Sequence, residues 1–317
     1  MAMNAFRTAA VVLALLPGVA LALPRAWVSA ETGIDTGDCR RTAPCRTFQY
    51  ALSQVDAGGE INALDSGGYG EMTINKAVTI DIASGVTASV VAVLVDAVTV
   101  YASTNDRIVL RGLSISSTTG RNGILARSFD TLYVERTTLD GPRDGSHGYG
   151  VLSAPNPAYR VVITDSVVSG YKFGFSVDST LVVQHWALIE RCRIVNNEVG
   201  ILIGNHARTL VRGSVISDND TGISVVNSSA PSLPTVAVLE DNSITHNSIF
   251  GVLVTAGVTV TAEATLSGNV IAMNGTGVFL DTSGGSGTAT ARTRTNNTIF
   301  RNGIEISGGT LTLLGAQ

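Results

Sequence analysis

The stretch Cys192-Arg-Ile-Val-Asn-Asn-Glu-Val-Gly-Ile-Leu-Ile203 decides the fold, because similar stretches recur along the chain. Its ending, a glycine followed by short apolar residues, occurs eight times at spacings of 22 to 29 residues. A second apolar phrase precedes each glycine, as in Asn242-Ser-Ile244, and a third apolar pair precedes that, as in Leu188-Ile189. Three short strands of period two per repeat predict the rungs of a right-handed parallel β-helix, stacked about 4.8 Å apart.

The repeats therefore predict one all-β solenoid of about ten coils, running from about residue 60 to residue 314. None of the three strands in a repeat is long enough for a helical repeat. Loops at 154–160, 178–186 and 227–235 interrupt the repeat, and we expect them to form one uneven rim.

Alignment of the repeats places asparagine in one column on five consecutive coils. We expect these residues to form a ladder in a tight turn, because asparagine tolerates left-handed backbone and its amide can bond the amides above and below. A neighbouring inward column holds small or polar residues, with Cys192 between Ser166 and Ser214, which predicts a buried, unreactive thiol. The ladder consists of Asn197, Asn219, Asn247, Asn274 and Asn302.

Strict alternation along the glycine-led strand separates an inward from an outward column. The inward column is expected to comprise Ile124, Val151, Phe175, Ile201, Ile223, Val252, Val278 and Ile304. The outward column is expected to comprise Leu125, Leu152, Ser176, Leu202, Ser224, Leu253, Phe279 and Glu305. Its apolar members predict a stripe that contacts a partner, most simply a second copy of the chain: Leu125, Leu152, Leu202, Leu253 and Phe279.

The composition excludes some classes of protein. With 21 Lys and Arg against 25 Asp and Glu, the net charge of −4 argues against a nucleic-acid partner, which would require a basic excess. Only 15% of the residues are charged and 44% are hydrophobic, which argues against extensive disorder.

The N-terminus has the features of a secretory signal. Arg7 precedes an apolar run, and Ala20-Leu-Ala22 supplies small residues for cleavage, so we expect a signal peptide at 1–22. The apolar run is too short for a membrane span. The sequence therefore predicts a secreted or periplasmic protein with no membrane span after signal cleavage. The mature chain would comprise an N-terminal extension with a capping helix at 23–59 and the β-helix at 60–317.

Cys39 and Cys45 enclose five residues. In an exported chain this spacing predicts a disulfide. The alternative is a pair of metal ligands, for which the nearby sequence offers no further Cys or His.

In its asparagine ladder and repeated Gly-Ile-x-Val phrase, the chain resembles the pectate-lyase-like family of right-handed β-helices. Pro44–Leu52, followed by Gly58-Gly-Glu-Ile61 and Gly67-Gly-Tyr-Gly70, is similar to that family's amphipathic capping helix and first rung. The likeness covers about residues 44–314 and implies a helix capped by Thr47. The family includes lyases, hydrolases, epimerases, esterases, adhesins and copper-site maturation factors, so the likeness implies a fold and no single activity.

Enzymes of this family carry catalytic groups on or beside the glycine-led strand. Asp218-Asn-Asp-Thr-Gly222 and Gly145-Ser-His-Gly-Tyr-Gly150 look like polygalacturonase motifs. They fall on coils three apart, about 14 Å, which is too far for joint action on one glycosidic bond.

A pectate-lyase mechanism needs carboxylates for calcium and a basic residue for proton abstraction. The nearest candidates form one turn column: Arg136, Asp165 and Arg191. Stacked opposite charges can equally neutralise one another, as expected for the neighbouring column of Glu190, Arg212 and Glu240.

These observations predict an exported β-helix protein with a non-catalytic binding or structural role at the cell surface or in the periplasm. A polysaccharide or a second copy would be its partner. The alternative is a carbohydrate-active enzyme, a polysaccharide lyase or hydrolase, acting on an acidic polysaccharide. The outward positions from Leu125 to Leu253 carry no charge, which favours the non-catalytic role. No cofactor or metal is expected, because the stacked pair Asp218 and His246 offers only two ligands at a solvated turn.

Overall fold

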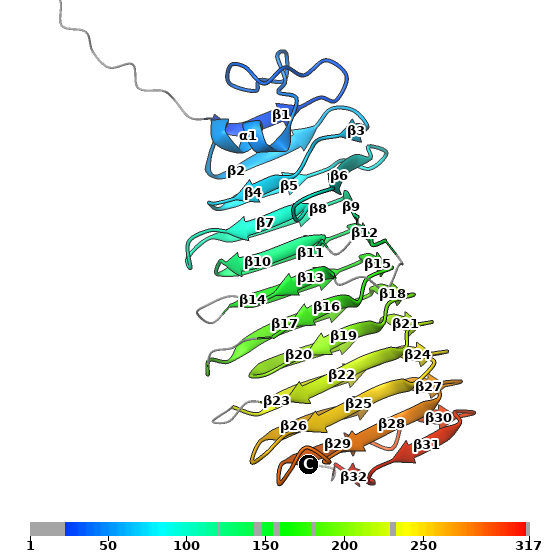
Figure 1. Ribbon diagram of the computed structural model, residues 1–317. Helices are drawn as coiled ribbons and strands as arrows, with labels where there is room; N and C mark the ends of the chain where they lie inside the picture. Colours follow the sequence, from blue (N-terminus) through cyan, green and yellow to red (C-terminus); the bar gives the residue numbers. More distant parts are fainter. Residues whose placement is uncertain are drawn as a thin grey trace, which may run out of the picture.

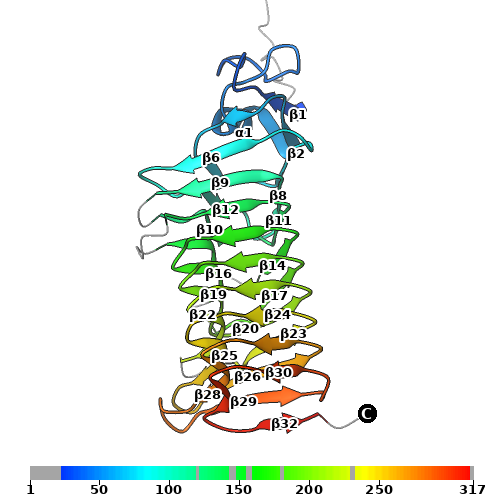
Figure 2. The same cartoon turned by 90° about the vertical axis from the view of Figure 1, so that its right-hand side faces the viewer.

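The computed structural model describes residues 23–118, 121–142, 148–154, 159–178, 182–228 and 233–314. Within these ranges the chain passes repeatedly through three parallel sheets that run along the whole solenoid (Figures 1 and 2). The predicted all-β parallel β-helix is therefore confirmed.

The three sheets are named here by their strands. The glycine-led sheet contains β4 (Met72–Ile74), β7 (Val98–Tyr101), β10 (Ile124–Ser128), β13 (Tyr149–Ser153), β16 (Phe173–Val177), β19 (Val199–Ile203), β22 (Thr221–Asn227), β25 (Phe250–Ala256), β28 (Thr276–Asp281) and β31 (Ile304–Ser307). The twelve-stranded sheet contains β1 (Leu23–Val28), β2 (Val55–Ala63), β5 (Val78–Asp81), β8 (Arg107–Arg111), β11 (Thr131–Glu135), β14 (Arg160–Thr164), β17 (His185–Glu190), β20 (Ala207–Arg212), β23 (Thr235–Glu240), β26 (Thr261–Ser267), β29 (Thr288–Thr293) and β32 (Leu311–Leu313). The short-strand sheet contains β3 (Gly67–Gly68), β6 (Ala88–Ala92), β9 (Leu113–Ser117), β12 (Thr138–Asp140), β15 (Val167–Ser169), β18 (Arg193–Val195), β21 (Val215–Ser217), β24 (Ser243–Thr245), β27 (Val270–Ala272) and β30 (Thr298–Phe300).

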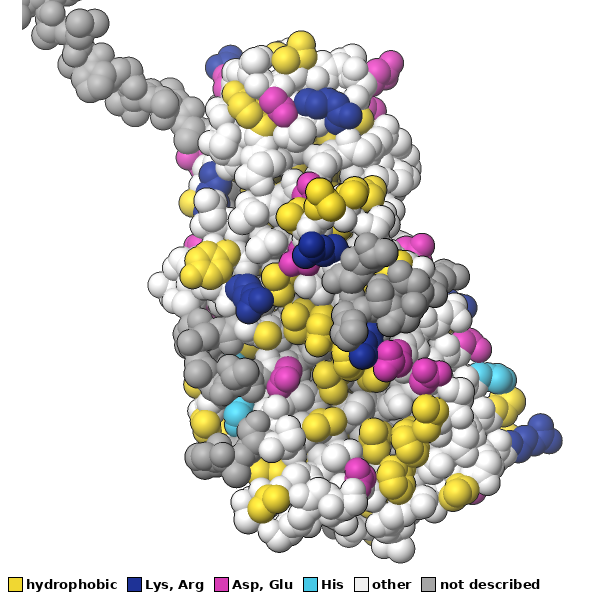
Figure 3. All heavy atoms as spheres, viewed as in Figure 1, with side chains coloured by type: hydrophobic (Ala, Val, Ile, Leu, Met, Phe, Trp, Pro, Cys, Tyr) yellow, Lys and Arg dark blue, Asp and Glu magenta, His cyan; other side chains and the backbone are white. Residues whose placement is uncertain are grey.

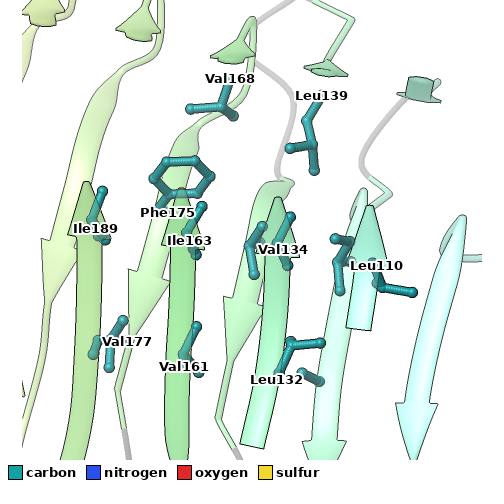
Figure 4. Packing of buried hydrophobic residues seen from close by; sticks show 14 of the residues in the cluster. Leu110, Leu132, Val134, Leu139, Val161, Ile163, Val168, Phe175, Val177 and Ile189 are labelled. Carbon is teal, nitrogen blue, oxygen red and sulfur yellow. The ribbon is translucent and has the colours of Figure 1, made fainter. Parts of the chain in front are cut away.

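Hydrocarbon side chains from all three sheets fill the inside of the solenoid. Phe175, Ile163 and Val168, one from each sheet, lie together in this core (Figure 4). The inward column pairs in the predicted register, from Ile124 with Val151 to Val252 with Val278. Because a one-residue slip would turn these residues outward, the register and the burial support each other.

The last coil departs from the predicted register. Ile306, and not Ile304, pairs with Val278, and Ile304 is 53% exposed. The position of Ile304 in the inward column was therefore predicted wrongly. β31 is the end strand of its sheet, so no further rung covers it.

Asparagine side chains form the predicted ladder at the corner between the short-strand and glycine-led sheets. Each Nδ2 donates to the Oδ1 of the next rung, at 3.0 Å from Asn197 to Asn219 and 2.8 Å from Asn247 to Asn274. The left-handed residue is the one before each ladder member, such as Asp218 (φ 58°), because the ladder side chain itself points inward. The expectation that the ladder asparagines adopt this conformation was wrong by one position.

A second ladder occupies the corner between the twelve-stranded and short-strand sheets. Asn242 donates to Asn269, and Asn269 donates to Asn297, at 3.0 and 2.9 Å. Cys192 continues this column as a free, buried thiol whose pKa burial raises to about 11. The prediction of a buried cysteine is confirmed.

The N-terminal segment closes one end of the core. Helix α1 (Phe48–Gln54) begins after Thr47, whose hydroxyl accepts a hydrogen bond from the backbone N–H of Tyr50 at 3.1 Å. Phe48 is buried, and its ring lies 4.9 Å from that of Tyr69. The predicted disulfide joins Cys39 to Cys45 beside this cap.

The described part of the chain contains no helix that is both long and apolar enough to cross a membrane. The expected signal peptide, residues 1–22, lies outside the described residues, as do Gly145–His147.

Candidate functional site

The outer face of the glycine-led sheet carries the predicted apolar stripe. The leucines Leu125, Leu152, Leu202 and Leu253 pair on adjacent strands with the outward residues between them, and each is partly exposed. Ser176 and Ser224 alternate with the leucines but are only 2% and 5% exposed, because their small side chains lie between larger neighbours one rung away. Apolar side chains are visible across the middle of this face (Figure 3).

A second outward column on this face consists of the residues that precede the leading glycines. It holds three aromatic residues: Tyr149, Phe173 and Phe250. The rings of Tyr149 and Phe173 stack at 4.9 Å, and Phe250 stacks on Phe279 of the stripe at 5.0 Å. Two stacked pairs of aromatic rings, called here the aromatic platforms, therefore lie on the same sheet face.

The glycine makes this geometry possible. A Cβ on Gly150 would lie 2.5 Å from the carbonyl oxygen of Gly174, and one on Gly251 would lie 2.7 Å from that of Gly277. No side chain can be accommodated there, so glycine occupies the position and the preceding aromatic residue turns to the surface. Strict alternation from the glycine onward could not reveal this column. The sequence signal that could have revealed it is the recurrence of an aromatic residue directly before the glycine.

A shallow pocket of about 410 Å³ lies at the edge of the same sheet. Lys172, Glu198 and Asp220 occupy equivalent positions on three successive rungs there, since Val199 N–H donates to the Lys172 carbonyl and Thr221 N–H to the Glu198 carbonyl. The Lys172 ammonium lies 5.9 Å from the centre of the Phe173 ring. The full lining is Gly170, Tyr171, Lys172, Asn196, Asn197, Glu198, Asp218 and Asp220.

The charges of this pocket indicate its ligand chemistry. Three carboxylates face one ammonium, so the pocket repels polyanions and offers acceptors for hydroxyl groups. Asp220 already accepts a hydrogen bond from the Ser248 hydroxyl at 2.8 Å. No group of three His, Cys, Asp or Glu side chains among the described residues is arranged to hold a metal ion.

The three candidate catalytic residues lie elsewhere, at the corner between the twelve-stranded and short-strand sheets. Arg136, Asp165 and Arg191 occupy equivalent left-handed positions, with φ values of 49°, 52° and 51°. Arg191 donates to both carboxylate oxygens of Asp165, at 2.8 and 3.0 Å, and this bonding lowers the pKa of Asp165. Arg136 pairs with Asp81 at 3.4 Å.

The neighbouring charge column behaves in the same way. Glu190 accepts from Arg212 at 2.8 Å and from Arg191 at 2.7 Å. Arg212 and Glu240 are register partners on adjacent strands. Both columns therefore consist of opposite charges that compensate one another on stacked rungs.

His185 and His206, which have no evident partner in the sequence, come together beneath the twelve-stranded sheet. Their side chains are 0% and 1% exposed, and the ring of His185 lies 4.3 Å from that of Tyr159. Burial, aided by the charge of His206, lowers the pKa of His185 to about 4. At neutral pH His185 is an uncharged core residue.

Comparison with known proteins assigns the family. The model of the right-handed β-helix region matches residues 96–314, so the chain belongs to this β-helix family. No match is found among curated proteins.

Solved structures confirm the pectate-lyase-like architecture. Pectate lyase Pel9A superimposes with a TM-score of 0.60 at 14% identity, covering 90% of this chain and 78% of that one. The A-module of mannuronan C-5 epimerase AlgE6 from Azotobacter vinelandii gives 0.55 at 16% identity, covering 82% and 92%. An alginate lyase from Paenibacillus sp. gives 0.50 at 17% identity, covering 84% and 94%. Identities this low establish a shared fold and leave the activity of this chain to its own residues.

Proposed function

We propose that the protein is an exported, non-catalytic β-helix that binds an extended, largely uncharged polysaccharide along the outer face of the glycine-led sheet. The observation that carries this proposal is the pair of aromatic platforms, Tyr149 with Phe173 and Phe250 with Phe279, on one face beside a carboxylate-rich pocket. The C–H groups of sugar rings can pack against these partly exposed aromatic rings, while sugar hydroxyls bond to carboxylates.

The arrangement of the two platforms along the solenoid axis suits a linear polymer. The platforms lie on rungs of one continuous sheet, so a glycan running along the solenoid axis would meet both of them. Leu202, on a strand between the two platforms, adds apolar surface without charge. Location outside the cytosol is supported by the Cys39–Cys45 disulfide, since such bonds persist in oxidising compartments.

A binding role without cleavage is supported by the state of the candidate catalytic charges. Arg191 and Asp165 are saturated by each other, and Arg136 by Asp81. An arginine held in an ion pair is a poor base, because its partner stabilises the charged form.

Affinity electrophoresis and titration calorimetry with two neutral polymers, soluble xylan and hydroxyethyl cellulose, test the proposal. We expect Phe250→Ala to weaken binding of a neutral polymer about fivefold, because it removes the ring that stacks on Phe279. The matched control is Phe300→Ala on the short-strand sheet, where Phe300 is 39% exposed. Failure of the folded protein to bind any neutral polymer, or equal losses in both variants, would contradict the proposal.

A glycoside hydrolase is the second candidate. Glu198 and Asp220 stand at equivalent positions one rung, or about 4.8 Å, apart, and retaining glycosidases place their two carboxyl groups about 5–5.5 Å apart. Release of reducing ends from the same polymers, abolished in both Glu198→Gln and Asp220→Asn, would establish hydrolysis. Absorbance from unsaturated products of polygalacturonate would instead indicate a lyase.

Self-association through the leucine stripe is the competing proposal for the same face. The structure reduces its support, because the leucines are only partly exposed and the serines between them are covered. The apolar area that a second copy could cover is therefore smaller than the sequence alone suggests.

A further inference from the structure

A column of exposed arginines runs along the outer face of the twelve-stranded sheet. Register pairing places Arg107, Thr131, Arg160, Trp186 and Arg208 side by side on five successive strands, β8 to β20 (Figure 2). The three arginines are exposed, and Trp186 is 50% exposed. Arginine therefore recurs on every second rung, about 10 Å apart, in a straight line parallel to the solenoid axis.

Among the residues that the structure describes, these arginines differ from the others of the twelve-stranded sheet in forming no ion pair with an acidic side chain. Arg111, Arg212 and Arg292 on the same sheet form ion pairs with glutamates. Within the ranges that the structure describes, Arg107, Arg160 and Arg208 form none. Their charge is therefore available to a ligand, although Asp106 and Asp130 lie in the adjoining turns.

Aromatic rings hold two of the guanidinium groups in place. Arg107 lies 4.5 Å from the centre of the Tyr133 ring, and Arg208 lies 5.4 Å from that of Trp186. Such contacts orient the planar guanidinium and leave its donors free for a carboxylate or sulfate. A shallow hollow of about 350 Å³ lies beside them, lined by Asp130, Thr131, Tyr159, Arg160 and Trp186.

We propose that this column, the arginine ladder, is a second binding site, for a linear polyanionic glycan that runs along the axis. The rung spacing is close to the length of one pyranose residue in an extended chain. In a chain with a two-fold repeat, every second sugar presents its acidic group to the same side, which matches arginines on alternate rungs. Trp186, which is 50% exposed, lies between Arg160 and Arg208, where the intervening sugar would lie.

The ladder is separate from the glycan-binding face proposed above, and the two differ in charge. The pocket beside the glycine-led sheet is acidic, whereas the ladder is basic. A neutral polymer and a polyanion would therefore bind to different sheets of the same solenoid. The ladder does not depend on the proposed function, and either site can fail without the other.

The test compares two triple variants with the same change in net charge. Arg107→Gln/Arg160→Gln/Arg208→Gln removes the ladder, and Arg41→Gln/Arg193→Gln/Arg301→Gln removes three exposed arginines elsewhere. Dissociation constants for polygalacturonate and alginate are measured by calorimetry at two salt concentrations, with circular dichroism to verify folding. We expect the ladder variant to bind at least about tenfold more weakly and to lose most of the salt dependence, and the control to bind like the unmodified chain.

Two further variants separate the sites and the ligand class. Trp186→Ala should weaken polygalacturonate binding about fivefold, whereas Phe250→Ala should leave it unchanged. Absence of uronate binding by the folded protein, or equal loss in both triple variants, would overturn the proposal. Tighter binding of single-stranded DNA than of either polyuronate would overturn the assignment to a glycan, since stacked bases also use such platforms.

Discussion

The outer faces of the glycine-led and twelve-stranded sheets share one core and one rung spacing but carry different side chains. The first combines leucines, stacked aromatic rings and an acidic pocket edge. The second combines exposed arginines, a tryptophan and compensated ion pairs. The solenoid thus fixes where outward residues lie, and the outward residues alone give each face its chemistry. Substitutions in the core should affect both faces, whereas substitutions on the surface should affect one.

The largest effect is expected from the shared core. Ile223→Ala truncates a fully buried side chain in the middle of the stack and should cost about 2–5 kcal/mol through lost transfer energy and a residual cavity. Denaturant unfolding measures this, and Val226→Ala, an outward change on the same strand, should cost less than about 1 kcal/mol. A loss below about 0.5 kcal/mol for Ile223→Ala would mean that the assigned register is wrong.

Acid should destabilise the fold through protonation of His185, which is buried beneath the twelve-stranded sheet. Because the pKa of His185 is about 4 in the folded protein and about 6.5 when unfolded, the unfolded chain binds the extra proton first as pH falls. The contribution of neutral His185 to the free energy of unfolding should be fully present above pH 6.5. The free energy of unfolding should then decrease by up to about 3 kcal/mol as the pH falls to 4. Unfolding curves at pH 7.5 and 4.5 measure this loss.

His185→Phe is the control for this pH dependence, because Phe retains a flat ring beside Tyr159 and cannot titrate. It should remove most of the difference between the two pH values. An unchanged difference would show that other groups, such as the carboxylates of the surface ion pairs, control acid sensitivity.

A somewhat smaller effect is expected at the corner that borders the glycine-led sheet. Asn247→Ala removes the acceptor of the Asn219 N–H and Nδ2 groups, both buried, and should cost about 2–3 kcal/mol. Asn302→Ala, at the partly exposed end of the ladder, should cost less because water can replace the amide. Denaturant unfolding measures both losses. If Asn247→Ala and Asn302→Ala lowered the free energy of unfolding equally, burial of the amides would not be what makes the ladder stabilising.

These elements show what the sequence could and could not predict. The glycine-led repeat and the asparagine ladder were predictable, because each sets one residue type at one position on successive rungs. Ile304 was misplaced because the end coil shifts its register relative to Val278. The arginine ladder was missed because loops of differing length separate the glycine-led strands from β14, β17 and β20, which hides the alignment of Arg160, Trp186 and Arg208.

The smallest effect is expected for the leucine stripe. If a glycan occupies this face, the protein should sediment as a monomer at micromolar concentration, and Leu202→Asp/Leu253→Asp should not change its sedimentation. A dimer that the double variant dissociates would instead support self-association through the stripe.

Oxidative footprinting of side chains with saturating xylan tests the central claim most directly, because it reports which residues a bound polymer shields. We predict strong protection of Tyr149, Phe173, Phe250 and Phe279, and unchanged oxidation of Phe300 on the short-strand sheet. Protection at Phe300, or a bound polymer that leaves all four aromatic residues of the glycine-led face unprotected, would contradict the account.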